Sequence, residues 1–142
     1  MRLLKDGKKV IASNLCGLHI PINGMYVTYG PASATWTSPP EADYNFFKTL
    51  GKLDGTGYAR VAITSSQLKD DGKIIYTAMI TTDDLVGAPI ADDSVLTTAT
   101  LVHLDEYDKS KDFFVYSAVL KNKIKILSGA YMVVNVGISI GE

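Results

Sequence analysis

The sequence predicts an all-β protein: an antiparallel β-sandwich or jelly roll with one long loop that carries a short helix. Isoleucine, valine and threonine supply 35 of the 142 residues, and these side chains fit a pleated, half-buried surface. The acidic residues are 12 Asp and only 3 Glu; Asp favours turns and caps, whereas Glu favours helix interiors. Short apolar segments with turn residues at intervals of roughly 8 to 12 positions complete the pattern of a sandwich.

Chain length and cysteine content limit the organisation of the protein. A chain of 142 residues can bury one substantial core but is short for two. We divide it into an N-terminal arm, residues 1–20, and a β-sandwich domain, residues 21–142. The single cysteine, Cys16, excludes an internal disulfide and favours synthesis in a reducing cytoplasm.

Charge and hydropathy exclude several classes of partner. The net charge of −1 argues against a protein built mainly to bind nucleic acid. No apolar run approaches the length of a transmembrane helix. The basic start lacks the continuous apolar segment of a secretory signal. We therefore expect neither nucleic acid nor a membrane among the partners.

The first half of the chain contains an arm, a strand and the long loop. Residues 1–20 combine a basic start with apolar segments that follow no clear period, which predicts an arm with one short strand. A Pro- and Gly-containing turn at 21–24 precedes a strand at 25–29. Within the loop at 30–57, a short helix is expected at 40–50, because proline opens that segment and glycine follows it. Loops of this length in a small domain are usually functional or form contact surfaces.

The second half reads as a series of strands. The first of them, at 58–64, places Ala59, Val61 and Ile63 on one face. A turn at 69–73 and a loop at 82–94 interrupt the series. Further strands are expected at residues 74–81, 97–104, 113–120, 123–127 and 131–140.

The side chains that could carry chemistry do not form a recognised constellation. Cys16 and His19 are spaced like half of a zinc site, but only His103 remains as a further ligand, and four are needed. A Cys–His nucleophile pair would need a basic environment that Cys16 lacks. Acidic pairs at 70–71, 83–84 and 92–93 suit turns, and the acidic segment 105–112 lacks the glycine and the spacing of a calcium loop. We expect no catalytic residues, no metal and no cofactor, and therefore no enzyme.

Two surface features admit two interpretations each. Lys121, Lys123 and Lys125 alternate along one short strand, where they could bind a polyanion. The favoured interpretation is that they protect an exposed edge strand from pairing with other chains. The aromatic residues of the long loop could anchor an interface or fold back onto the core of their own chain; these are Trp36, Tyr44, Phe46 and Phe47.

Three blocks of sequence resemble a group of small virion structural proteins from tailed bacteriophages. The first, residues 23–29, is similar to their early strand. The second joins the aromatic-rich segment 43–50 to the Tyr-x-Arg-Val strand at 57–63. The third combines Gly-Ala-Pro-Ile at 87–90, an apolar strand at 99–104, Asp-Phe-Phe-Val-Tyr-Ser at 112–117 and the closing strand. Together they cover roughly residues 22–140.

This resemblance implies a non-enzymatic virion protein, made in the host cytoplasm and bound to the outside of a phage head as a decoration protein. The implied partners are the major capsid protein and further copies of this chain, with a trimer as the first expectation. Such a protein gains affinity by repeating a modest contact over a symmetric shell. The basic arm could order along a neighbouring capsid subunit. The candidate interface residues are Trp36, Tyr44, Phe46, Phe47, Lys8 and Lys9.

Two alternatives remain open. A tail-fibre or baseplate component would belong to the same class but occur in fewer copies per particle. A carbohydrate-binding β-sandwich would instead use Trp36, Tyr44 and aspartates of the long loop to stack on sugars, with these aromatics exposed around a shallow groove.

Overall fold

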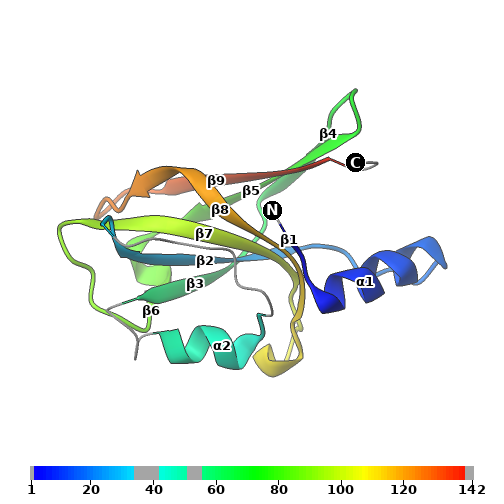
Figure 1. The fold of residues 1–142 in the computed structure, drawn as a ribbon, viewed down its shortest axis with the longest axis horizontal. Helices are drawn as coiled ribbons and strands as arrows, with labels where there is room; N and C mark the ends of the chain where they lie inside the picture. Colours follow the sequence, from blue (N-terminus) through cyan, green and yellow to red (C-terminus); the bar gives the residue numbers. More distant parts are fainter. Residues whose placement is uncertain (1, 34–41, 51–55, 140–142) are drawn as a thin grey trace.

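The computed structural model, which describes residues 2–33, 42–50 and 56–139, confirms a mostly antiparallel β-sandwich (Figure 1). One sheet contains six strands in the order β1-β8-β7-β2-β3-β6, and the other contains three in the order β4-β5-β9. The strands are β1 Arg2–Leu3, β2 Gly24–Pro31, β3 Gly57–Ala62, β4 Ser65–Leu68, β5 Lys73–Ile80, β6 Leu85–Val86, β7 Ser94–His103, β8 Phe113–Lys125 and β9 Met132–Ser139. The α-helices are α1 Lys5–Leu15 and α2 Tyr44–Thr49, and single 3₁₀ turns span Thr82–Asp84 and Lys109–Lys111.

The main core lies between the two sheets. Inward side chains of β2, β7 and β9 alternate with side chains on the opposite face, as a pleated strand requires. Strand β9 shows this most clearly: Met132, Val134, Val136 and Ile138 are buried, while the residues between them are exposed or half-buried. The strand expected at residues 131–140 is therefore confirmed over its described residues.

A second apolar cluster covers the other face of the six-stranded sheet. Tyr26, Tyr58 and Phe114 project from β2, β3 and β8 and pack against Phe47 of helix α2. Asp43 begins that helix, because its side chain accepts a hydrogen bond from the backbone N–H of Phe46 at 2.8 Å. The six-stranded sheet is therefore packed on both faces, whereas the three-stranded sheet has one open face.

Several elements differ from the sequence-based expectation. The segments 113–120 and 123–127 were expected as two strands, but one strand, β8, runs from Phe113 to Lys125. Its pairing with β7 shifts register near Leu96, which accommodates extra β8 residues in a bulge. The polar strand β4 was not anticipated, because all four of its side chains are exposed and show no apolar alternation.

The N-terminal segment contains the expected short strand and also a helix that the sequence did not predict. Arg2–Leu3 pairs with β8, and Lys5–Leu15 forms an eleven-residue helix that packs on the same strand. Leu4 and Val10 are buried, and this packing stabilises a helix whose sequence shows no side-chain N-cap. The helix ends at Leu15, and Cys16 is its C-cap. Gly17 follows with a positive φ of 88°, the conformation that glycine commonly supplies just after a helix.

At Gly7, helix α1 lies close against the backbone of β8. A Cβ atom at this position would overlap the backbone carbonyl of Val115, and backbone cannot rotate away as a side chain can. An alanine is normally better than glycine in a helix by about 1 kcal/mol. At Gly7 the steric conflict reverses that preference.

We therefore expect Gly7→Ala to lower the free energy of unfolding by about 1 to 3 kcal/mol, the usual cost of overpacking. Ser13→Ala in the same helix is the control and should change stability by less than about 0.5 kcal/mol. Urea unfolding followed by circular dichroism measures both variants. A Gly7→Ala protein as stable as the wild type would contradict the packing of α1 on β8.

Candidate functional site

The described part of the chain offers three features for functional analysis: a buried ionic cluster, the exposed surface of α1, and a groove between β8 and β9. The ionic cluster consists of Tyr26, Arg60 and Asp112. Arg60 donates through Nε to Asp112 Oδ2 at 2.7 Å and through Nη2 to Oδ1 at 2.9 Å. The Tyr26 hydroxyl donates to Oδ2 at 2.5 Å. The backbone N–H of Asp105 supplies a fourth donor at 2.7 Å.

The environment keeps this carboxylate ionised. Burial by itself acts to raise the pKa of Asp112, but the hydrogen bonds from Arg60, Tyr26 and the Asp105 backbone outweigh it, so that the pKa is lowered. The hydrogen bond to Asp112 raises the pKa of Arg60 above its already high value. Burial, followed by the hydrogen bond to Asp112 and its charge, raises the pKa of Tyr26. The cluster therefore holds Asp112 as a carboxylate, Arg60 as a cation and Tyr26 as a neutral phenol.

The geometry assigns the ionic cluster a structural role. Its carboxylate accepts four hydrogen bonds and is fully buried, while the Arg60 side chain is only 21% exposed. A saturated carboxylate of this kind joins β2, β3 and the start of β8. Arg60 also donates to the Asp105 carbonyl at 3.2 Å, which fixes the loop before β8.

The aromatic residues proposed as interface anchors lie in different environments. Phe47 is 1% exposed and packs in the second apolar cluster. Tyr44 and Phe46 are half-buried against that cluster. Trp36 lies outside the described residues. Of the two interpretations of these aromatic residues, the position of Phe47 agrees with the one in which the loop folds back onto the core of its own chain.

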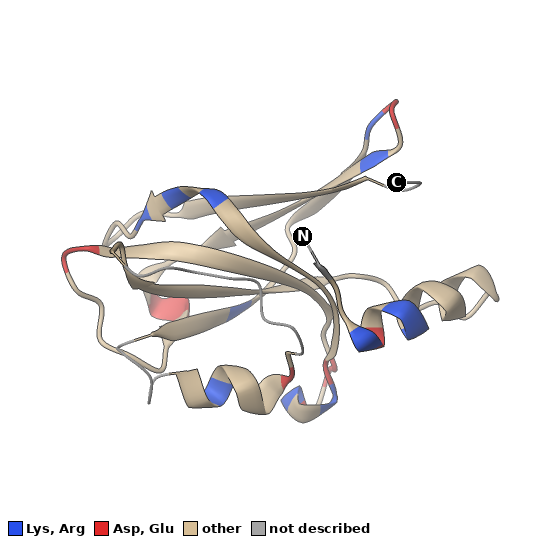
Figure 2. Cartoon of the chain, viewed as in Figure 1, with Lys and Arg blue, Asp and Glu red and all other residues tan. Residues whose placement is uncertain are grey.

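The surface of α1 combines lysines with exposed apolar side chains. Lys8 and Lys9 are exposed. Ile11 and Leu15 are 43% and 85% exposed, and Leu18, just after the helix, is 63% exposed. The C-terminal part of the helix extends away from the sandwich, and its lysines lie nearer the sheet (Figures 1 and 2). We call these five residues the α1 surface.

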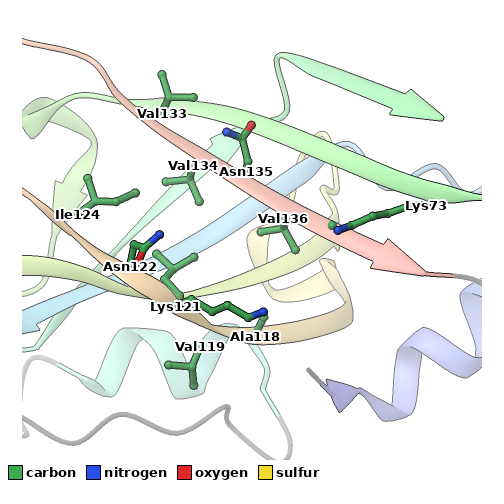
Figure 3. A pocket seen from close by; sticks show the side chains of 12 residues that line it. Lys73, Ala118, Val119, Lys121, Asn122, Ile124, Val133, Val134, Asn135 and Val136 are labelled. Atoms are coloured by element: carbon green, nitrogen blue, oxygen red, sulfur yellow. The ribbon is translucent and has the colours of Figure 1, made fainter. Parts of the chain in front are cut away.

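A groove of about 510 Å³ separates β8 from β9 (Figure 3). Its walls are mainly aliphatic, and Lys121 and Lys73 stand at its rim. Residues 120–123 of β8 pair with no strand of the described residues. This places two members of the lysine row on an exposed strand segment, as the protective interpretation predicts.

The other candidate ligands do not converge. Cys16 and His19 are exposed, while the His103 ring Nδ1 lies 2.7 Å from the Pro21 carbonyl. Within residues 2–33, 42–50 and 56–139, no three His, Cys, Asp or Glu side chains are arranged to hold a metal ion. The acidic pairs serve turns: Asp71 accepts from the Lys73 backbone and Asp84 from the Thr81 backbone.

The comparisons with known proteins give no further guide. No protein-family description, curated protein or solved structure matches this chain. Among the described helices, none has the length and apolar character needed to cross a membrane.

The ionic cluster was not predicted from the sequence. A signal for it was present, because Arg60 is a single charge in the middle of an otherwise apolar strand, and such a charge usually has a buried partner. The partner was not readable: Asp112 is 52 residues away and belongs to an acidic segment whose other members form turns.

Replacing Asp112 with Asn should lower the free energy of unfolding at pH 7 by about 2 to 3 kcal/mol, because Arg60 loses its ionic partner. The pKa of Asp112 is lower in the folded state, so its contribution is present above the unfolded pKa and is lost as pH falls through the folded one. The difference between variant and wild type should therefore shrink near pH 3. Urea titrations at both pH values measure it, with the exposed Asp92→Asn as control. An equal difference at both pH values would contradict this account.

Alkaline conditions should destabilise the protein through Tyr26. Because its pKa is raised in the folded state, its contribution is complete below the unfolded value of 10.0 and declines as pH rises above that value. We expect Tyr26→Phe to be less stable at pH 8 but to lose stability less steeply between pH 10 and 11. Thermal unfolding measures this, and Tyr107→Phe, at a side chain 91% exposed, should keep the wild-type slope.

Proposed function

We propose that the protein is a non-enzymatic structural component of a virus particle, most specifically a decoration protein that binds the outside of a phage head through the α1 surface. The observation that carries this proposal is the α1 surface itself. Its three apolar side chains extend from the sandwich into solvent. Contiguous exposed apolar groups rimmed by charge commonly mark protein interaction sites.

The chemistry of this surface indicates the kind of patch it would bind. Ile11 and Leu15 are four residues apart and therefore share one side of the helix. Lys8 and Lys9 precede them. An apolar depression bordered by acidic side chains on the capsid protein would complement this arrangement. One such contact is small, but repetition over a symmetric shell raises the total strength of attachment.

The role of the N-terminal segment in binding cannot be tested by deleting it, because part of it is buried in the core. A deletion of residues 1–20 would remove Leu4 and Val10 from the core, so loss of binding would not separate contact from folding. Substitution of the exposed residues alone avoids this problem.

The double variant Leu15→Ser/Leu18→Ser should retain its fold and lose at least about 90% of its occupancy on particles, if each buried leucine contributes about 1.5 kcal/mol or more. Occupancy is measured by incubating undecorated heads with purified protein and quantifying the bound protein per major capsid protein. Leu68→Ser is the control, because Leu68 is also highly exposed, at 72%, but lies on the β4–β5 hairpin. Normal occupancy of the double variant would refute the role of the α1 surface.

Stoichiometry in purified particles distinguishes the virion alternatives. Hundreds of copies per particle support decoration, whereas a few to a few dozen support a tail-fibre or baseplate component. The carbohydrate-binding alternative receives less support from Tyr44, which is half-buried against the second apolar cluster instead of exposed beside a groove. Saturable binding to a glycan array would revive that alternative.

A further inference from the structure

The free edges of the two sheets differ in how far they are protected against pairing with another chain. Natural sheets protect their edges with short strands, lysines, prolines or bulges. In the six-stranded sheet, β1 and β6 have two residues each, and the unpaired segment of β8 carries lysines. In the three-stranded sheet, β4 has four residues. All of these edges show a protective device.

Strand β9 has none of these devices. It contains eight residues, Met132–Ser139, with no charged residue and no proline. Its pairing with β5 runs from Lys73↔Ser139 to Ile80↔Met132 without a register shift. Its other edge pairs with no strand of the described residues. A long, regular and uncharged edge of this kind is a template for another strand.

The groove beside β9 leaves room for that strand. It is bordered by β9 on one side and by residues 118–124 of β8 on the other (Figure 3). Leu120 and Ile124 lie on the β8 side and are only half-buried. A strand added to β9 would place every second side chain over these two residues and remove them from water.

We propose that the occupant is β9 of a second copy of this chain, paired antiparallel about a two-fold axis at Asn135. In this register Val134 lies opposite the second copy's Val136, and Met132 lies opposite its Ile138, so all inward pairs are apolar. On the outer face Asn135 meets its own symmetry mate, and an amide can both donate and accept. The two three-stranded sheets then form one six-stranded sheet across the dimer.

The other strand that a second copy could offer to β9 is its β4, and this strand fits less well. Pairing of β4 with β9 would cover only four of the eight positions and would leave half of the edge open. The two-fold arrangement covers both copies of β9 at once and closes the assembly, as isologous interfaces do. The net charge of −1 opposes such an association only weakly. Lys73 and Lys121 line the same groove, so their long side chains must keep their ammonium groups in water when the strand is added. This inference concerns the free protein and does not depend on the proposed virion role.

The first test is the mass of the purified protein in solution. Light scattering coupled to size-exclusion chromatography should give about twice the 15.3 kDa of one chain. Asn135→Lys places two like charges opposite each other and should raise the dimer dissociation constant by about tenfold or more. Ser66→Lys, on the exposed strand β4, is the control and should leave the dissociation constant unchanged. The proposal would be overturned by a monomeric wild type. It would also be overturned if Asn135→Lys and Ser66→Lys changed the dissociation constant equally.

The second test is disulfide cross-linking in a Cys16→Ser background. Residues directly opposite in an antiparallel ladder have Cα atoms about 4.5 to 5.5 Å apart, which a disulfide can bridge. Asn135→Cys should therefore form a covalent dimer on mild oxidation. Val133→Cys should not, because its symmetry mate lies about 13 Å away along the strand. Preferential cross-linking of Asn135→Cys to Gln67→Cys in a mixture would assign the groove to β4 and overturn the proposal.

Discussion

The buried pair between Arg60 and Asp112 is the interaction on which most of the outer layer depends. Asp112 also accepts from Tyr26, and the Tyr26 ring lies 4.6 Å from Phe47 and 4.9 Å from Phe114 between centroids. The pair therefore orients the ring around which the second apolar cluster packs. Because the carboxylate is fully buried, removal of either charged partner would leave an uncompensated charge close to that cluster.

A sheet packed on both faces restricts where this protein can contact others. Buried threonines of the six-stranded sheet pair with one another; Thr28 Oγ1, for example, lies 2.8 Å from Thr97 Oγ1. The exception among the described residues is Thr100 Oγ1, which is buried without a hydrogen-bond partner. The free backbone edge of β9 and the exposed apolar side chains of the α1 surface lie outside this doubly covered sheet. Both belong to elements that are partly buried in a core, which lowers the entropic cost of ordering them on contact.

The two proposed surfaces use different physical means of recognition. The α1 surface relies on side chains, and its specificity would come from shape and charge on the partner. The β9 edge relies on backbone hydrogen bonds, and its specificity comes from strand length and from the alternation of apolar residues. Because the surfaces lie on different elements, self-association and attachment to a particle can occur together, and each would reinforce the other on a repeating lattice.

The local sequence pattern was sufficient to predict the sandwich and its main strands, because alternation and turn residues are local signals. It also indicated the short helix of the long loop, although its observed bounds are Tyr44–Thr49. The helix at residues 5–15, in contrast, depends on tertiary structure. Its buried residues are Gly7 and Val10, and it is stabilised by packing on β8. The ion pair between Arg60 and Asp112 and the free edge of β9 also depend on the tertiary structure. These features depend on which distant segments become neighbours, and that information does not reside in any local pattern.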